Sequence, residues 1–227
     1  MPDTTLTAAA ILFDFDGVLV DSTPAVIRHW DTFAARHSLA PGNPILHEHG
    51  RDGRAKIAAL RETMDLQYDI EEEHAWFEAL EVDEANHLTV FPGVLELLAA
   101  LPQDRWAIYT ACTGRLVTAR LRAAGLPFPT VIVSADDVTV GKPQPDGYLA
   151  AAAGLGVAAR ACAVIEDAPA GIRAGNAAGA RTIAVATTHP AGDLREAAFT
   201  VAAISDLAVV SAREPGLSLR LHTVVTV

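Results

Sequence analysis

Two aspartates stand one residue apart in the segment ILFDFDGVLVDS, residues 11–22. The apolar residues 11–13 predict a buried strand, which Gly17 ends just after the second acid. Strand geometry sends side chains i and i+2 to the same face, so we expect Asp14 and Asp16 to point the same way. Adjacent carboxylates raise each other's pKa unless a cation lies near them, so the pair suits a site that holds a cation. The alternative is that one aspartate only ends the strand, as aspartates in turns often do.

Four further polar residues follow apolar segments or precede helices. Thr110 ends the segment WAIYT, Glu166 and Asp167 follow CAVI, and Lys142 lies in the loop VGKP. Each has a structural alternative: the threonine or the acid pair could cap a helix, and the lysine could be a solvated surface charge. Together with the aspartate pair they supply a nucleophile, a second carboxylate, a hydroxyl, a cation and an acid pair.

The elements that must position these residues alternate along the chain. Uniformly apolar strands separated by helices indicate a parallel sheet covered on both faces, which is a doubly wound α/β fold. The strands are predicted at 11–13, 106–110, 130–134, 162–166 and 181–186. Ligands of such sheets bind beyond the carboxyl ends of the strands, where the candidate residues stand.

Residues 24–88 differ from the rest because they contain helical patterns and no convincing strand. Pro24 suits the first turn of a helix, and Pro92 with Gly93 ends the helical section. We therefore predict an α/β core formed by residues 1–22 and 91–227, with residues 23–90 as an inserted all-helical domain. The tail beyond Pro190 fits helix or strand.

Composition excludes several classes of function. The 227 residues carry a formal net charge of −11, and the pI near 5.1 argues against nucleic acid or an anionic membrane as partner. No apolar stretch approaches the ~20 residues of a membrane span. The N-terminus has no basic region typical of a signal peptide, and the two cysteines, in apolar surroundings, suit reduced thiols, so we expect a cytoplasmic protein. A monomer and a small homo-oligomer both fit.

Four segments together resemble the motifs of the haloacid dehalogenase (HAD) superfamily, in the branch with a helical C1-type cap after the first motif. They are DFDGVLVDS, WAIYTACTGRL, VGKPQPDGYL and AVIEDAPAGIRAGNAAG. The stretches HGR, FPGVLELLAALP and SADDVTVGKP most resemble the sugar-phosphate and glycerol-3-phosphate phosphatases of that branch. The resemblance implies a Rossmann-like HAD core with the inserted helical section as its cap.

The resemblance also implies a role for each core residue. Asp14 would attack phosphorus in line and form an aspartyl-phosphate. Asp16 would protonate the leaving alkoxide and then activate the water that hydrolyses the intermediate. Thr110 and the amide of Ala111 would bind phosphoryl oxygens, and Lys142 would offset their negative charge.

A Mg²⁺ cofactor is part of the same implication. The ion would be held by the Asp14 carboxylate, the backbone carbonyl of Asp16 and Asp167, with Glu166 either a ligand or a partner of the ligands. Such oxygen-only ligands suit a hard cation that keeps several waters. The metal and Lys142 would then make the closeness of the two aspartates tolerable.

Two places bear on substrate recognition. In EHGRDGR the donors of His49, Arg51 and Arg54 are predicted to contact the substrate from the cap, although either arginine could be a solvated helix charge. After Thr110, relatives usually carry Ser-Gly, whereas this chain has Ala-Cys at 111–112. The change removes a hydroxyl near the phosphate and keeps the backbone amide.

The resemblance implies that the acid at position 16 favours a phosphate ester, because the dehalogenases and phosphonate hydrolases of the superfamily lack an acid there. We therefore predict a Mg²⁺-dependent phosphatase of small phosphorylated metabolites, namely sugar or polyol phosphates. One alternative is a sugar phosphomutase that uses the same core. The other is a protein that binds a phosphorylated metabolite without turnover.

Overall fold

The central element of the structure, a computed structural model that describes residues 4–40, 46, 53–213 and 216–222, is a six-stranded sheet. All its strand pairs are parallel, in the order β6-β5-β2-β7-β8-β9. The strands are β2 (Ile11–Phe13), β5 (Trp106–Tyr109), β6 (Ile132–Val133), β7 (Ala163–Glu166), β8 (Arg181–Val185) and β9 (Phe199–Val201). Because β2 lies between β5 and β7, the segments that follow these three strands meet at one edge.

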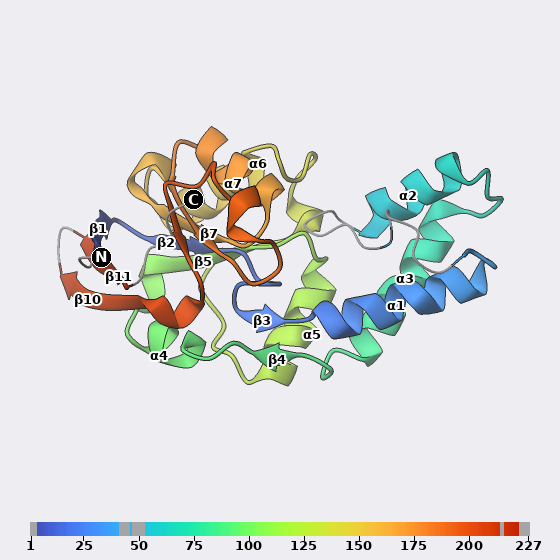
Figure 1. Cartoon of the computed structure of the whole chain (residues 1–227), viewed down its shortest axis with the longest axis horizontal. Helices are drawn as coiled ribbons and strands as arrows, with labels where there is room; N and C mark the ends of the chain where they lie inside the picture. The colour runs from blue at the N-terminus through green and yellow to red at the C-terminus, as the bar shows by residue number, and fades with distance from the viewer. Residues whose placement is uncertain (1–3, 41–45, 47–52, 214–215, 223–227) are drawn as a thin grey trace.

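Helices cover both faces of this sheet (Figure 1). In β2, Ile11 and Phe13 pack into one buried cluster and Leu12 into another. The first cluster is covered by α4 (Val94–Ala99) and α5 (Gly114–Ala124), and the second by α6 (Asp146–Gly154) and α7 (Pro169–Ala177). Burial of each such side chain contributes about 2–3 kcal/mol. The predicted doubly wound α/β fold is confirmed.

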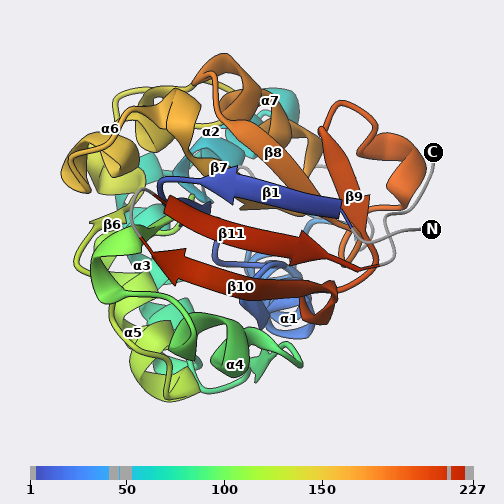
Figure 2. The same ribbon diagram turned by 90° about the vertical axis from the view of Figure 1, so that its left-hand side faces the viewer.

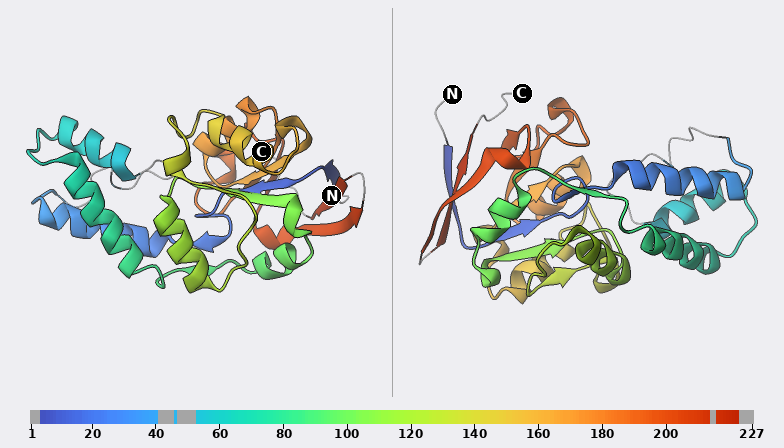
Figure 3. Two further views of the ribbon diagram at one scale, coloured as in Figure 1. Left: turned by 180° about the vertical axis from the view of Figure 1, so that it is seen from behind. Right: turned by 90° about the horizontal axis from the view of Figure 1, so that it is seen from below.

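Three helices stand apart from the sheet, on the right in Figure 1, on the left in the left-hand view of Figure 3 and on the right in its right-hand view. They are α1 (Thr23–Arg36), α2 (Gly53–Thr63) and α3 (Ile70–Asp83), and they bury an aromatic cluster that includes Trp30, Phe33 and Phe77. The chain enters and leaves them through β3 (Val20–Asp21) and β4 (Thr89–Val90), which pair antiparallel. We call residues 23–90 the helical segment. In the described ranges no helix combines the length and apolarity that crossing a membrane needs.

A second, antiparallel sheet joins the two ends of the described chain (Figure 2). Its order is β1 (Thr4–Ala8), β11 (Gly216–Leu221) and β10 (Leu207–Arg213). Leu6, Leu219 and Leu221 point into the same buried cluster as β2. The tail, whose pattern fitted helix or strand, therefore forms β9, β10 and β11. The strand at the N-terminus was not predicted.

Candidate active site

Asp14 and Asp16 lie in the loop beyond β2, because the strand ends at Phe13. Strand alternation therefore does not set their directions, although both line one cavity of about 510 Å³. The cavity lies at the carboxyl edge of the sheet, and residues of the helical segment line its other side. Gly17 follows with φ 80°, and a Cβ there would stand 2.1 Å from Asp167 Oδ2, so only glycine fits this turn.

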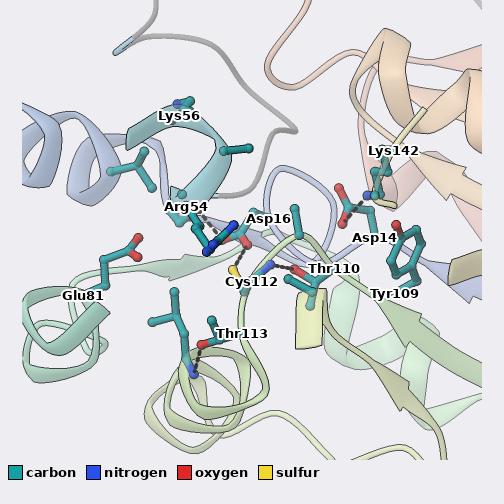
Figure 4. Close-up of a pocket in the computed structure, with 18 of the residues that line it drawn as sticks. Asp14, Asp16, Arg54, Lys56, Glu81, Tyr109, Thr110, Cys112, Thr113 and Lys142 are labelled. Atoms are coloured by element: carbon teal, nitrogen blue, oxygen red, sulfur yellow. Dashed lines mark hydrogen bonds and ion pairs between the residues drawn. The ribbon is translucent and has the colours of Figure 1, made fainter. Parts of the chain in front are cut away.

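Lys142 reaches Asp14 from the loop before α6. Its Nζ lies 2.9 Å from Asp14 Oδ1 (Figure 4). The same atom lies 2.6 Å from Glu166 Oε1. The side chain is 1 % exposed, so the alternative of a solvated surface lysine is wrong. Burial opposes its charge, but Asp14 and Glu166 raise the pKa of Lys142 well above its usual range. The ammonium group is therefore a permanent cation beside the Asp14 carboxylate.

Glu166 is fully buried at the end of β7, and four groups donate to its carboxylate. Lys142 and the Tyr148 hydroxyl, at 2.7 Å, contact Oε1, while the amides of Asp167 and Ala168 donate to Oε2 over 3.1 and 3.4 Å. A Cβ at Gly171 of α7 would stand 1.7 Å from Oε1, so the helix packs directly on the carboxylate. Both oxygens are therefore held in place by protein donors.

Asp14, Glu166 and Asp167 each offer one oxygen, and these oxygens lie within 4.8 Å of one another. Asp167 Oδ2 also accepts a hydrogen bond from Thr188 Oγ1. Burial, and then the charge of Glu166, raises the pKa of Asp167 to about 7 and the pKa of Asp14 well above its usual range. One lysine faces three carboxylates here. The oxygen donors and their excess negative charge suit a hard divalent cation.

The Asp16 carboxylate, 28 % exposed, has a different set of partners. Its Oδ1 accepts from Ser22 Oγ at 2.5 Å and from Arg120 Nη1 at 2.7 Å, and its Oδ2 accepts from Cys112 Sγ at 3.0 Å. Cys112 was expected in apolar surroundings and instead lies in the site. Burial and the neighbouring charge of Asp16 raise the pKa of the Cys112 thiol, which keeps it a donor. Of these partners, only Cys112 had a sequence signal, as the departure from Ser-Gly.

Thr110 follows β5 directly, and its side chain is buried. Its Oγ1 accepts from the amide of Cys112 over 3.1 Å, and Thr110 and Ala111 both line the cavity. The alternative that Thr110 caps the next helix is wrong, because Thr113 caps α5 by accepting from the Leu116 amide. The structure thus brings the sequence-predicted core residues together at one edge.

Of the predicted cap residues, His49 and Arg51 lie outside the described residues. Arg54 stands in the first turn of α2, lines the cavity and forms an ion pair with Glu71 of α3. Sequence reasoning missed Lys56, which is 3 % exposed, lines the cavity and places Nζ 4.8 Å from the centroid of the Trp30 ring. Lys56 lies one turn into a helix, and nothing in its sequence environment indicates that it faces a cavity.

Comparison with known proteins identifies the family, because residues 8–179 match the family model of haloacid dehalogenase-like hydrolases. The chain belongs to this family. Hexitol phosphatase A of Escherichia coli (strain K12) is 44 % identical over 77 % of this chain and 81 % of the relative. Glycerol-1-phosphate phosphohydrolase 1 of Saccharomyces cerevisiae is 33 % identical over 82 % of this chain and 78 % of the relative.

The fold of this HAD-like hydrolase also matches solved structures. The crystal structure of CbbY from Rhodobacter sphaeroides in complex with phosphate superposes with a TM-score of 0.76, at 24 % identity, over 88 % of this chain and 96 % of that one. The predicted family, the fold and the enzyme class, a phosphoric monoester hydrolase, are therefore confirmed. The roles of the individual site residues stay predictions.

Proposed function

We propose that this HAD-like hydrolase cleaves the phosphate monoesters of polyols or sugars, with Mg²⁺, through an aspartyl-phosphate on Asp14. The observation that carries the proposal is the buried Lys142 ammonium 2.9 Å from the Asp14 carboxylate, in a cavity that also holds Asp16. The names of the two relatives, a hexitol phosphatase and a glycerol-1-phosphate phosphohydrolase, support the substrate class.

In the first step an Asp14 oxygen attacks phosphorus, and the bond from phosphorus to the alkoxide breaks. The Phe15 amide and Lys142 both contact Asp14 Oδ1, so the carboxylate is fixed before the substrate arrives. Asp16 donates a proton to the departing alkoxide, which leaves as an alcohol. Lys142, Thr110 and the Ala111 amide bind the phosphoryl oxygens as negative charge builds on them.

In the second step a water molecule replaces the alcohol. The Asp16 carboxylate, now deprotonated, takes a proton from the water, whose oxygen attacks the acyl phosphate. The bond between Asp14 and phosphorus breaks, inorganic phosphate leaves and the Asp14 carboxylate is restored. Asp16 thus serves as acid and then as base, which requires its carboxylate to face the cavity in both steps.

The carboxylates of Asp14 and Asp167 and the backbone carbonyl of Asp16 would hold the Mg²⁺ ion. When bound, the ion neutralises charge on the phosphoryl group and orients it. We place Glu166 outside this set of ligands, because protein donors occupy both of its oxygens. Its part is to hold the Lys142 ammonium at Asp14.

The helical segment would act as the cap that reads the leaving group. The cavity side of this segment offers cations, Arg54 and Lys56, together with carboxylates, Glu78 and Glu81, and the ring of Trp30. Mixed donors and acceptors next to an aromatic ring suit a neutral, hydroxyl-rich leaving group better than an anionic one. A covering domain would also exclude water from the phosphoryl site.

The proposal is tested with purified protein and a panel of hexitol, hexose and glycerol phosphates plus p-nitrophenyl phosphate. We expect phosphate release with Mg²⁺, its loss with chelator, and the best kcat/KM on a polyol or sugar ester. No release on any ester would favour the non-catalytic binding protein. If a hexose phosphate isomerises before free phosphate appears, the enzyme is a phosphomutase instead.

A further inference from the structure

Arg120 connects the core and the helical segment through two ion pairs. It stands on α5 of the core, and its Nη1 lies 2.7 Å from Asp16 Oδ1. Its Nη2 lies 3.2 Å from Glu81 Oε1, which belongs to α3 of the helical segment. Figure 4 shows Glu81 on the side of the helical segment, with Asp16 and Cys112 further into the cavity.

The guanidinium is buried, with the side chain 3 % exposed. A buried cation that loses a partner is left uncompensated, and the planar fork of arginine fixes the direction of both pairs. Burial opposes the charge, but Asp16, then Cys112 and then Glu81 raise the pKa of Arg120 above its usual range. The arginine therefore requires both carboxylates to be in place.

The Glu81 pair is part of the surface on which α3 meets α5. One α3 turn before it, Glu78 accepts from the Thr113 hydroxyl and lies 3.3 Å from Arg115 Nη1. The Arg115 pair is exposed, with 60 % of that side chain in solvent, and Arg115 contacts α3 from outside the cavity lining. Of the two arginines that α5 presents to α3, only Arg120 therefore also contacts the proposed acid.

We propose that Arg120 is a positioning residue that makes the orientation of the Asp16 carboxylate depend on the seating of α3. This inference rests on the proposed function, in which Asp16 is the general acid. With Glu81 in place, Arg120 fixes the Asp16 carboxylate, which lines the cavity, through its Oδ1. When α3 moves away from α5, Arg120 loses its ion pair with Glu81. The guanidinium that donates to Asp16 is then no longer held in one position. Proton delivery is thereby confined to the state in which the cap covers the substrate.

The leaving group provides a readout that a structural role would not move. An alkoxide needs a proton from Asp16 to leave, whereas p-nitrophenolate leaves without one. We therefore compare kcat/KM on a polyol phosphate (glycerol 1-phosphate or a hexitol phosphate, whichever is faster) with kcat/KM on p-nitrophenyl phosphate. This constant covers only the steps through release of the leaving group, so it leaves out the later step in which Asp16 acts as a base for both esters. A general loss of folding or of metal would lower both rates alike.

For R120M we expect kcat/KM on the polyol ester to fall about 10- to 100-fold, which is part of the contribution of a general acid, and kcat/KM on the aryl ester to fall about 3-fold or less. R120K, which keeps the charge, should recover part of the polyol rate. E81Q should lower the ratio of the polyol constant to the aryl constant by about 3-fold or more. The double variant R120M/E81Q should show nearly the same ratio as R120M, because Arg120 and Glu81 act as one unit. R115M is the matched control and should leave the ratio unchanged.

Circular dichroism and a thermal melt establish which variants fold. If R120M does not fold, the test uses E81Q instead. This change is isosteric, and the Glu81 side chain is 14 % exposed. Equal losses on the two esters, or no loss, in a folded variant would overturn the inference while the wild type stays active. A wild type that hydrolyses neither ester overturns the proposed function, and the inference falls with it.

Discussion

Asp167→Asn should stabilise the metal-free protein, although it removes a predicted metal ligand. Asp167 is 3 % exposed, and burial together with the charge of Glu166 raises its pKa from 3.8 to about 7. The difference between these two pKa values corresponds to roughly 4 kcal/mol of unfolding free energy lost when the carboxylate ionises. Asparagine does not ionise, and its oxygen can still accept from Thr188.

The effect must depend on pH in a particular direction. Because the folded pKa lies above the unfolded one, the folded state holds the proton more tightly and loses stability as pH rises. The cost is nearly absent below about pH 4, grows through the window up to about pH 7 and is constant above it. At about 2–4 °C per kcal/mol for a protein of this size, Asp167→Asn should raise Tm by up to roughly 8–16 °C at pH 8 and very little at pH 4.

The assay is a series of thermal melts between pH 4 and 8, first with chelator and then with Mg²⁺. The metal should raise the Tm of the wild type by binding its native state alone, and should do little for Asp167→Asn. Asp31→Asn, on the exposed face of α1, is the control and should match the wild type throughout. A difference between Asp167→Asn and the wild type that is constant with pH, or equal stabilisation of both by Mg²⁺, would refute the reasoning.

Three further changes test the site. Asp14→Asn should abolish turnover of a phosphate ester, because an amide is a poor nucleophile, and Asp16→Asn should cost about 10²–10⁴-fold; near-normal initial rates in either would contradict its role. Arg54→Ala should change kcat/KM among good substrates by about 10-fold, with p-nitrophenyl phosphate much less affected; an unchanged substrate ranking would leave Arg54 a surface charge. Gly171→Ala should destabilise by about 1–3 kcal/mol in urea unfolding, since its Cβ would overlap Glu166, and an unchanged midpoint would show that α7 can shift.

The parallel core and its acidic edge could be predicted from sequence because local signals agree there. Strands β2, β5 and β7 are uniformly apolar, and a polar residue ends or follows each of them, so the fold class brought Asp14, Thr110 and Asp167 to one edge without any knowledge of long-range contacts. Lys142 was a candidate because it precedes a helix, although its Gly-Lys-Pro turn is typical of a surface residue, and the resemblance to HAD motifs gave it a role. The structure buries it.

What could not be predicted depends on contacts between distant segments. Arg120 follows Asp16 by 104 positions, and an arginine in an amphipathic helix gives no sign of whether it faces solvent or a buried carboxylate. The strand β1 is five residues with a mixed pattern, and only its partner β11 makes it a strand. Cys112 gave a signal as a departure from the usual pattern, but its donation to Asp16 required the fold.

The pairing of β1 with β11 delays closure of the buried cluster until late in synthesis of the chain. Leu6 lies opposite Leu219, so this part of the buried cluster cannot close until nearly all of the described chain has left the ribosome. Until then, the apolar side of the nascent sheet that holds Ile11 and Phe13 lacks the cover that β11 provides. The nascent protein therefore exposes this apolar face until β11 has been synthesised.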